Sequence, residues 1–237
     1  QSIIRDLSKV SFQDCSLDSK GAAFEYFVRA TLKGKKLGQY FTPRELVQVM
    51  LHLVGKEKIT NKVNFDGSMK VLDPSCGTGG FLVFLMQDAI RKIQSDLSKR
   101  RINNEQAEKA IKALKEKVFY GSDANDGVAC SAKMNMIIAG DGHTNIQHED
   151  SLSANSLNWN VTSPDCDLIL TNPPFGTSEK ASLTGSDAAQ FPIKTSKGQL
   201  LFLQKMVLST KPGGEICTVI DEGVLNNDNA KELRKWL

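Results

Sequence analysis

The sequence predicts an α/β protein built around an open, mostly parallel sheet with helices on both faces. Short apolar segments alternate with longer segments of helical periodicity, as expected for repeated strand–helix units. A glycine-rich turn at 74–80 joins the first strand of the series to the next helix, which is how nucleotide-type βαβ units begin. The length of 237 residues fits one large domain with a short extension.

The composition is that of an ordinary globular chain, with 40% hydrophobic and 24% charged residues. Five scattered cysteines form no CxxC pair, and the three histidines have no metal-ligand spacing with them. We therefore expect reduced thiols, a cytoplasmic location and no bound metal. No apolar run approaches the length of a membrane span, and the GxSxG motif of serine hydrolases is absent. The net charge of +3 gives only weak support for an anionic partner.

Residues 1–37 are expected to form the end of an N-terminal helical region, and residues 38–237 the remaining core. Within the first part, 17–32 places its apolar side chains near one face at helical spacing, which is typical of a packing helix. The first ten residues lack both an initiator methionine and the layout of a signal peptide. The chain is therefore interpreted as a fragment of a longer protein.

The core is expected to open with a helix at Pro43–Val54, with proline as its first residue. Thr42 is the predicted N-cap, and Glu45 stands in the position of a capping box. The N-terminus of this helix could bind an anion. A well-capped helix would explain most of the segment, but it does not explain the adjacent pair of exposed aromatic residues, Tyr40 and Phe41.

Lys70–Asp73 is the next predicted strand, and the turn Pro74–Gly80 leads from it into a helix expected over 81–99. Glycines allow a ligand to approach the backbone closely, and the N–H groups at the helix start face that ligand. The turn matches neither GxGxxG nor GxxxxGK[ST], so neither a dinucleotide nor a cradled phosphate is the first expectation. The carboxylate of Asp73 favours a ligand that carries an ammonium group.

Two more predicted strands also end in acidic residues. The strand at 118–123 ends in Asp123, which in nucleotide-binding sheets would bind ribose hydroxyls. The strand at 145–150 ends in Asp150, which could accept a hydrogen bond from an adenine amino group. A solvated helix at 103–117 lengthens the usual gap after the glycine-rich turn, and a further helix is expected at 126–139.

The fourth predicted strand, Asp167–Leu170, stops in a stiff turn at the edge where open α/β sheets bind ligands. There the side-chain oxygen of Asn172 and the carbonyl of Pro173 could accept the two hydrogens of the adenine amine, which localises its lone pair. Phe175 could stack on the base once the base has left the duplex. For this tetrapeptide alone, a proline-rich turn after a core strand remains an equally good explanation.

The rest of the chain contains one long loop and three further elements. Residues 177–197 are predicted to form a mobile surface loop whose lysines could contact phosphates, although an ordinary disordered loop explains the composition equally well. An amphipathic helix is expected at 199–210, and a turn at 212–214 precedes a fifth strand at 215–220. A last helix begins at 229.

Taken in order, these segments resemble the modification (M) subunit of type I restriction-modification enzymes, a family of S-adenosylmethionine-dependent N6-adenine DNA methyltransferases. The resemblance covers roughly 38–237 and rests on GQYFTP at 38–43, VLDPSCGTGGFL at 71–82, YGSDAND at 120–126, DLILTNPPFG at 167–176, KGQLLFLQKM at 197–206 and KPGG at 211–214. GQYFTP before the glycine-rich turn and NPPF after it is the γ-type motif order. The resemblance implies a Rossmann-like class I methyltransferase sheet whose last strands, C-terminal tail and most of the N-terminal helical domain are missing here.

The resemblance also implies a role for each candidate residue. The implied cofactor-binding residues are Tyr40, Phe41, Thr42, Asp73, Ser75, Gly77, Thr78, Gly79, Asp123, Asp150 and Asn172, and the implied catalytic residues are Asn172, Pro173 and Phe175. The segment 40–42 would close over the methionine end of S-adenosylmethionine, and Asp73 with the glycine-rich turn would hold its amino group. Asp123 would bind the ribose, and Asp150 the adenine amino group of the cofactor. The catalytic residues would grip and stack the flipped target adenine.

The implied reaction is an in-line displacement on the sulfonium methyl group, with no covalent enzyme intermediate and no metal. The implied partners are double-stranded DNA, a specificity (S) subunit, a second M subunit and the restriction (R) subunit, and no membrane. Two alternatives remain. A protein-glutamine N5 methyltransferase would use an NPPY-type loop, so Phe175 and GQYFTP argue against it. A non-catalytic cofactor-binding scaffold would not need the intact NPPF loop.

Overall fold

The computed structural model of the chain describes residues 42–55, 68–140, 145–175, 183 and 185–237. In these residues five strands form one sheet in the order β3-β2-β1-β4-β5, and every neighbouring pair is parallel. The strands are β1 (Val71–Asp73), β2 (Phe119–Asp123), β3 (Asn145–His148), β4 (Cys166–Thr171) and β5 (Thr210–Thr218). The predicted α/β fold with a parallel sheet is confirmed.

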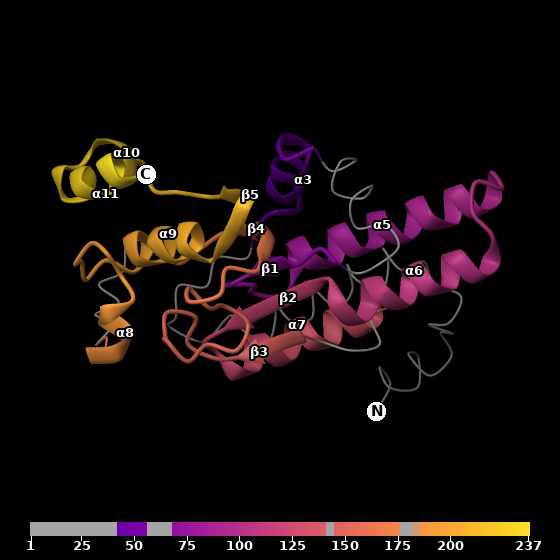
Figure 1. Ribbon diagram of the computed structural model, residues 1–237, viewed down its shortest axis with the longest axis horizontal. Coiled ribbons are helices and arrows are strands. Elements are labelled where there is room, and N and C mark those ends of the chain that lie inside the picture. Colours follow the sequence, from indigo (N-terminus) through magenta and orange to yellow (C-terminus); the bar gives the residue numbers. More distant parts are fainter. Residues whose placement is uncertain (1–41, 56–67, 141–144, 176–182, 184) are drawn as a thin grey trace, which may run out of the picture.

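In the described residues, helices lie before β1, between successive strands except between β3 and β4, and after β5 (Figure 1). They are α3 (Arg44–Leu53), α5 (Gly80–Ser98), α6 (Asn104–Lys117), α7 (Asp126–Ile138), α8 (Gly185–Ala189), α9 (Gly198–Ser209), α10 (Glu222–Asn226), the 3-10 turn η2 (Asp228–Ala230) and α11 (Lys231–Trp236). The α5–α6 hairpin is the longest feature of Figure 1 and extends away from the sheet. No helix in the described ranges is both long enough and apolar enough to cross a membrane.

The two faces of the sheet belong to two separate apolar clusters. Val71, Leu168 and Leu170 pack in one cluster with α3, α5 and α7, whereas Leu72 and Ile169 pack in the other with α9, α10 and α11. Successive strand residues point to opposite faces, so neighbouring residues in one strand serve different clusters. Strands buried on both faces read as continuous apolar runs, and the predicted covering of both faces by helices is confirmed.

Local capping explains why several helices begin close to the predicted positions. Asn103 accepts a hydrogen bond from the backbone N–H of Gln106, whose side chain accepts from the N–H of Asn103, which is a complete capping box for α6. Asn125 caps α7 through the N–H of Val128. Both signals involve residues three apart in the chain, so they require no tertiary contact.

The predicted cap of α3 is wrong. Pro43 is the N-cap, with φ −57° and ψ 144°, and no side chain among the described residues caps the helix, so the capping box predicted with Glu45 does not form either. The first helical residue is Arg44 rather than Pro43. The hydroxyl of Thr42 instead accepts a hydrogen bond from the Asn172 side chain, 130 residues later in the chain. A tertiary contact has thus taken the group that the local pattern assigned to the helix.

Three other expectations need correction. The segment predicted as a loop without secondary structure contains α8 and a buried phenylalanine, Phe191, although 176–182 and 184 lie outside the described residues. The turn at 212–214 lies inside β5, because Cys166 pairs with Thr210 but Leu168 pairs with Glu215, which leaves four residues of β5 opposite one of β4. The C-terminal segment forms α10, η2 and α11 instead of one helix from 229.

The helical region expected at 1–37, its boundary with the core, and Tyr40 and Phe41 all lie outside the described residues.

Candidate functional site

The candidate site lies at the carboxyl edge of the sheet, where the strand order reverses. From β1 the chain continues to β2 on one side, while β4 lies on the other side. Open α/β sheets bind ligands at this switch point. Asp73 ends β1, Asp123 ends β2, Asp150 lies two residues beyond β3 and Asn172 directly follows β4. The structure therefore brings four of the predicted site residues to one edge.

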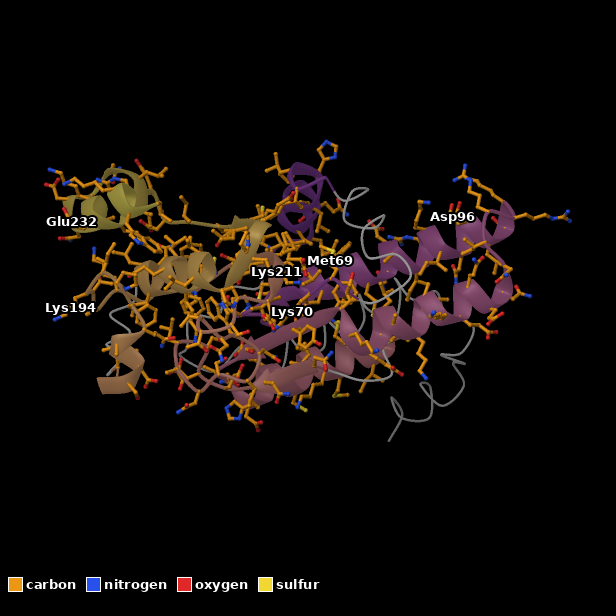
Figure 2. The ribbon with its side chains drawn as sticks, viewed as in Figure 1. Met69, Lys70, Asp96, Lys194, Lys211 and Glu232 are labelled. Atoms are coloured by element: carbon orange, nitrogen blue, oxygen red, sulfur yellow. The ribbon has the colours of Figure 1, made fainter. Side chains whose placement is uncertain are left out.

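At the opposite edge of the sheet, where the strands have their amino ends, ion pairs connect neighbouring strands. Just before β1, the ammonium of Lys70 lies 2.8 Å from Asp165 Oδ2, and the ammonium of Lys211 lies 2.8 Å from Asp167 Oδ2. The backbone N–H of Lys70 donates to that same Asp167 oxygen at 2.8 Å, which joins the two pairs. Both lysines are labelled near the middle of Figure 2. These contacts tie β4 to β1 and β5 at their amino ends, so we assign them to stability and the carboxyl edge to function.

The backbone of the glycine-rich turn after β1 faces the site. Gly77 and Gly79 have φ of 55° and 80°, a region that side-chain-bearing residues rarely adopt. A Cβ atom added to Gly77 would meet no heavy atom of the described residues within 4 Å, so the backbone there is open to a ligand. The N–H of Gly77 donates to Asp123 Oδ2 at 3.2 Å, and the N–H of Asn125 donates to Oδ1 at 2.9 Å. The predicted ribose-binding carboxylate thus lies directly beside the turn.

Asp73 and Asp123 form a pair of shielded carboxyl groups. Burial raises the pKa of Asp73 to about 7, against the hydrogen bonds that it accepts from Thr171 and from the N–H of Ser75, and the charge of Asp123 raises it further. Burial also raises the pKa of Asp123, although the N–H groups of Asn125 and Gly77 oppose the shift. The charge of Asp123 disfavours ionisation of Asp73, so a ligand with positive charge or hydroxyl donors fits beside them.

Ser75 joins the glycine-rich turn to the turn after β4. Its hydroxyl oxygen lies 2.7 Å from the hydroxyl oxygen of Thr171, and it donates to the backbone carbonyl of Asn172 at 3.2 Å. Thr78 is buried, and its carbonyl accepts from the Asn135 side chain on α7 at 2.9 Å. Both residues were predicted to bind a cofactor; the contacts seen here fix the shape of the turn.

The side chain of Asn172 is held by one end only. Its Nδ2 donates to the hydroxyl of Thr42 at 3.2 Å, whereas its Oδ1 is buried and has no hydrogen-bond partner among the described residues. Leaving a buried acceptor unpaired costs about 1–3 kcal/mol, so such a group needs an explanation. Pro173 next to it is buried, and Phe175 is half-buried. The arrangement presents a hydrogen-bond acceptor that is already oriented.

The loop after β3 carries Asp150 at the rim of the site. Asp150 is exposed, and its Oδ1 accepts from the N–H of Leu152 at 2.9 Å. The preceding residue, Glu149, accepts from the hydroxyls of Ser122 and Ser156 at 2.6 and 2.8 Å. No local pattern predicts this role of Glu149, because its partners lie 27 residues before it and 7 residues after it. Glu149 shapes the loop that presents Asp150.

Comparison with known proteins places these features in a wider group. Residues 16–237 match the family described as N-6 DNA Methylase. The chain is similar to the StySPI type I restriction enzyme methylase subunit of Salmonella potsdam, with 29% identity over 89% of this chain and 36% of that protein. It is similar to the EcoKI methylase subunit of Escherichia coli K12, with 27% identity over the same shares. The chain thus spans little more than a third of the length of these curated relatives.

Solved structures show the same fold. The crystal structure of the EcoKI M protein is matched with a TM-score of 0.60 and 26% identity, over 83% of this chain and 37% of that one. A Vibrio vulnificus protein, provisionally described as a modification subunit of a type I restriction enzyme, gives a TM-score of 0.71 at 24% identity, over 99% and 46%. A Listeria monocytogenes protein, provisionally described as a class I S-adenosylmethionine-dependent methyltransferase, gives 0.66 at 18%, over 97% and 61%.

Proposed function

Because the chain belongs to the N-6 DNA methylase family, we propose that it transfers a methyl group from S-adenosylmethionine to the N6 amine of a flipped adenine in double-stranded DNA. It would do so as the modification subunit of a type I restriction-modification system. The observation that carries this proposal is the buried Oδ1 of Asn172 at the carboxyl end of β4, which has no hydrogen-bond partner in the part of the chain that the structure describes, with Pro173 next to it. An acceptor held ready in this way fits a ligand that brings its own N–H groups.

The residues at the edge of the sheet fit S-adenosylmethionine, which would supply an activated methyl group on a positively charged sulfonium. Asp73, with its raised pKa, would hold the ammonium of the ligand, and Asp123 its ribose hydroxyls. The open backbone at Gly77 leaves room for close approach. We further propose that Asp150 binds the adenine amino group, and that Ser75, Thr78 and Gly79 shape the turn.

For the target base, Asn172 Oδ1 and the carbonyl of Pro173 would accept the two amine hydrogens, and Phe175 would stack on the ring. Two acceptors on the hydrogens localise the nitrogen lone pair and aim it, so positioning and electrostatics would lower the barrier. The Thr42 hydroxyl would keep the amide from turning over, since it holds the nitrogen end. Tyr40 and Phe41 would close over the ligand from the same segment as Thr42.

The partners we propose are double-stranded DNA, a specificity subunit, a second modification subunit and the restriction subunit. Relatives such as the StySPI and EcoKI proteins carry the name of a methylase subunit of a type I enzyme, which supports an assembly of several chains. Glutamine methylation of a protein is not favoured, because the matching family is described as N-6 DNA Methylase and relatives such as StySPI and EcoKI are named as restriction enzyme methylase subunits.

The test is Asn172→Ala in the intact protein with its partners. We expect methylation of unmethylated DNA to fall by at least about 100-fold, because one preorganised acceptor is lost at the reacting amine. Binding of S-adenosylmethionine, measured by calorimetry, should persist. Asn160→Ala, a change at an exposed asparagine, is the control and should retain activity. Undiminished methylation by Asn172→Ala, or wild-type methylation of a release-factor-type protein in place of DNA, would refute the proposal.

A further inference from the structure

Lys205 is the only charged residue of α9, and its side chain is completely buried, with 0% exposure. Lysine is almost never fully buried unless its charge is compensated. Here the ammonium donates to the backbone carbonyls of Ser151 and Ser153, both at 2.7 Å, and lies 5.0 Å from the ring centroid of Trp159. The charge is therefore held by two carbonyl dipoles and an aromatic face.

The two carbonyls belong to the loop that follows β3 and begins with Asp150. The carbonyl between them, that of Leu152, accepts from the side-chain amide of Gln190 at 2.7 Å. Three successive carbonyls are thus bound by long side chains from outside the loop. Leu152 itself is buried, and its N–H donates to the carboxylate of Asp150. The conformation that presents Asp150 at the rim therefore depends on contacts made behind the loop.

The same contacts reach the glycine-rich turn. The hydroxyl of Ser151 donates to the carbonyl of Pro74 at 2.5 Å, and Pro74 is the first residue of that turn. Lys205 holds Ser151 through its carbonyl, so it supports the hydroxyl contact as well. One side chain from α9 thereby braces two separate parts of the candidate cofactor site, which come from opposite sides of β2 in the sheet.

We propose that Lys205 is a positioning residue for S-adenosylmethionine, which fixes the loop 150–153 and, through Ser151, the glycine-rich turn. This inference rests on the proposed function. A neutral, apolar side chain would leave two buried carbonyls without a donor, and the loop would have to shift to find new partners. Burial lowers the pKa of Lys205 to about 8, but nearby Glu149, Asp150 and Asp187 favour the charged form. The ammonium form supplies the donors that the loop needs.

The test compares Lys205→Met, which keeps length and volume, with the wild type in the intact protein. We expect the Kd and the KM for S-adenosylmethionine to rise by about tenfold or more, because the unpaired carbonyls displace the loop. The kcat at saturating cofactor and the KM for DNA should stay close to wild type. Lys205→Gln keeps an amide donor without the charge and should give an intermediate Kd.

Gln204→Met is the matched control. Gln204 is equally buried in the same helix, but its amide bonds the backbone of Ile193 at 2.8 and 3.1 Å instead of the loop 150–153. It should lose stability without losing affinity for S-adenosylmethionine. An equal loss of affinity in this control would overturn the inference, because general loosening of α9 would then explain both results.

Other outcomes are equally decisive. Wild-type affinity in a folded Lys205→Met protein would overturn the inference, and if that variant does not fold, wild-type affinity in Lys205→Gln would do so. If the wild type binds S-adenosylmethionine and methylates DNA, and Lys205→Met binds S-adenosylmethionine with the same affinity, only this inference is refuted. A wild-type protein that does not bind S-adenosylmethionine would end the proposed function and this inference together.

Discussion

Folding makes the side chain of Asp73 harder to ionise. An aspartate in an unfolded chain titrates near pH 4, whereas burial raises the pKa of Asp73 in the folded protein to about 7. Between these two values the folded state binds more protons than the unfolded state, so the free energy of unfolding falls as the pH rises through this window. A binding site for a cation would benefit from such a group, because the ligand relieves the cost of ionising it.

From this we predict how the stability of Asp73→Asn depends on pH. The variant has no carboxyl group to ionise, so its free energy of unfolding should gain about 1–3 kcal/mol relative to wild type between pH 5 and pH 8. Urea unfolding of both ligand-free proteins at several pH values measures this difference. Asp228→Asn, a change at an exposed residue, should follow the wild type. Parallel curves for Asp73→Asn and wild type would show that Asp73 ionises normally.

The residue scale also shows where sequence patterns mislead. Thr42 before a proline has the pattern of an N-cap, yet its hydroxyl accepts from Asn172. The pattern considers only neighbours in the chain, and here a partner 130 residues away wins. Lys205 had a readable signal, a single charge in an otherwise uncharged helix, but the two carbonyls that it binds could not be named without the fold.

At the scale of elements, the bounds of two helices were predicted accurately, because a capping residue lies next to each of them in the chain. The helices α6 and α7 each follow an asparagine that caps them, and their predicted bounds differ from the observed ones by one residue at one end. By contrast, α8 has five residues and no apolar stripe. Its Asp187 accepts from the N–H of Ala154 at 2.7 Å, a contact that no local pattern reveals. The bulge in β5 likewise depends on pairing with β4.

The turn before α5 offers a prediction about backbone conformation. Gly77 has φ of 55°, and Gly80 is the first residue of α5, and in both cases an added Cβ would meet nothing within 4 Å. Because space is equally open, the two substitutions differ only in backbone strain. We expect Gly77→Ala to lower the free energy of unfolding by about 1–2 kcal/mol, and Gly80→Ala to raise it by at most about 1 kcal/mol. Chemical denaturation measures both. Equal effects would mean that the turn relaxes without strain.

At the scale of the whole molecule, the candidate site is assembled from distant parts of the chain. The loops after β1, β3 and β4 are joined at the carboxyl edge of the sheet, because Ser75 links the first to the third, and Ser151, held by Lys205, links the first to the second. The strands and two of their acidic ends, Asp73 and Asp123, could be predicted, because each depends on a short stretch of sequence. The third predicted acidic end, Asp150, lies two residues beyond the observed end of β3. The ties between loops could not be predicted, because they require the strands to be already side by side.

These ties predict that S-adenosylmethionine will protect the edge of the sheet as one unit. In the intact protein, ligand at ten times its Kd should slow amide hydrogen exchange about tenfold in 73–80, 120–126 and 149–153, if those amides exchange only after the ligand leaves. The turn at 98–104 between α5 and α6 lies at the far end of that hairpin from the strands and should keep its rate (Figure 1). In Lys205→Met, the protection of 149–153 should weaken most, because that loop loses its brace directly. Protection confined to 73–80 would contradict a single linked edge, because the loops would then respond independently. Protection that reaches 98–104 would contradict it as well, because it would reflect a general stabilisation of the fold.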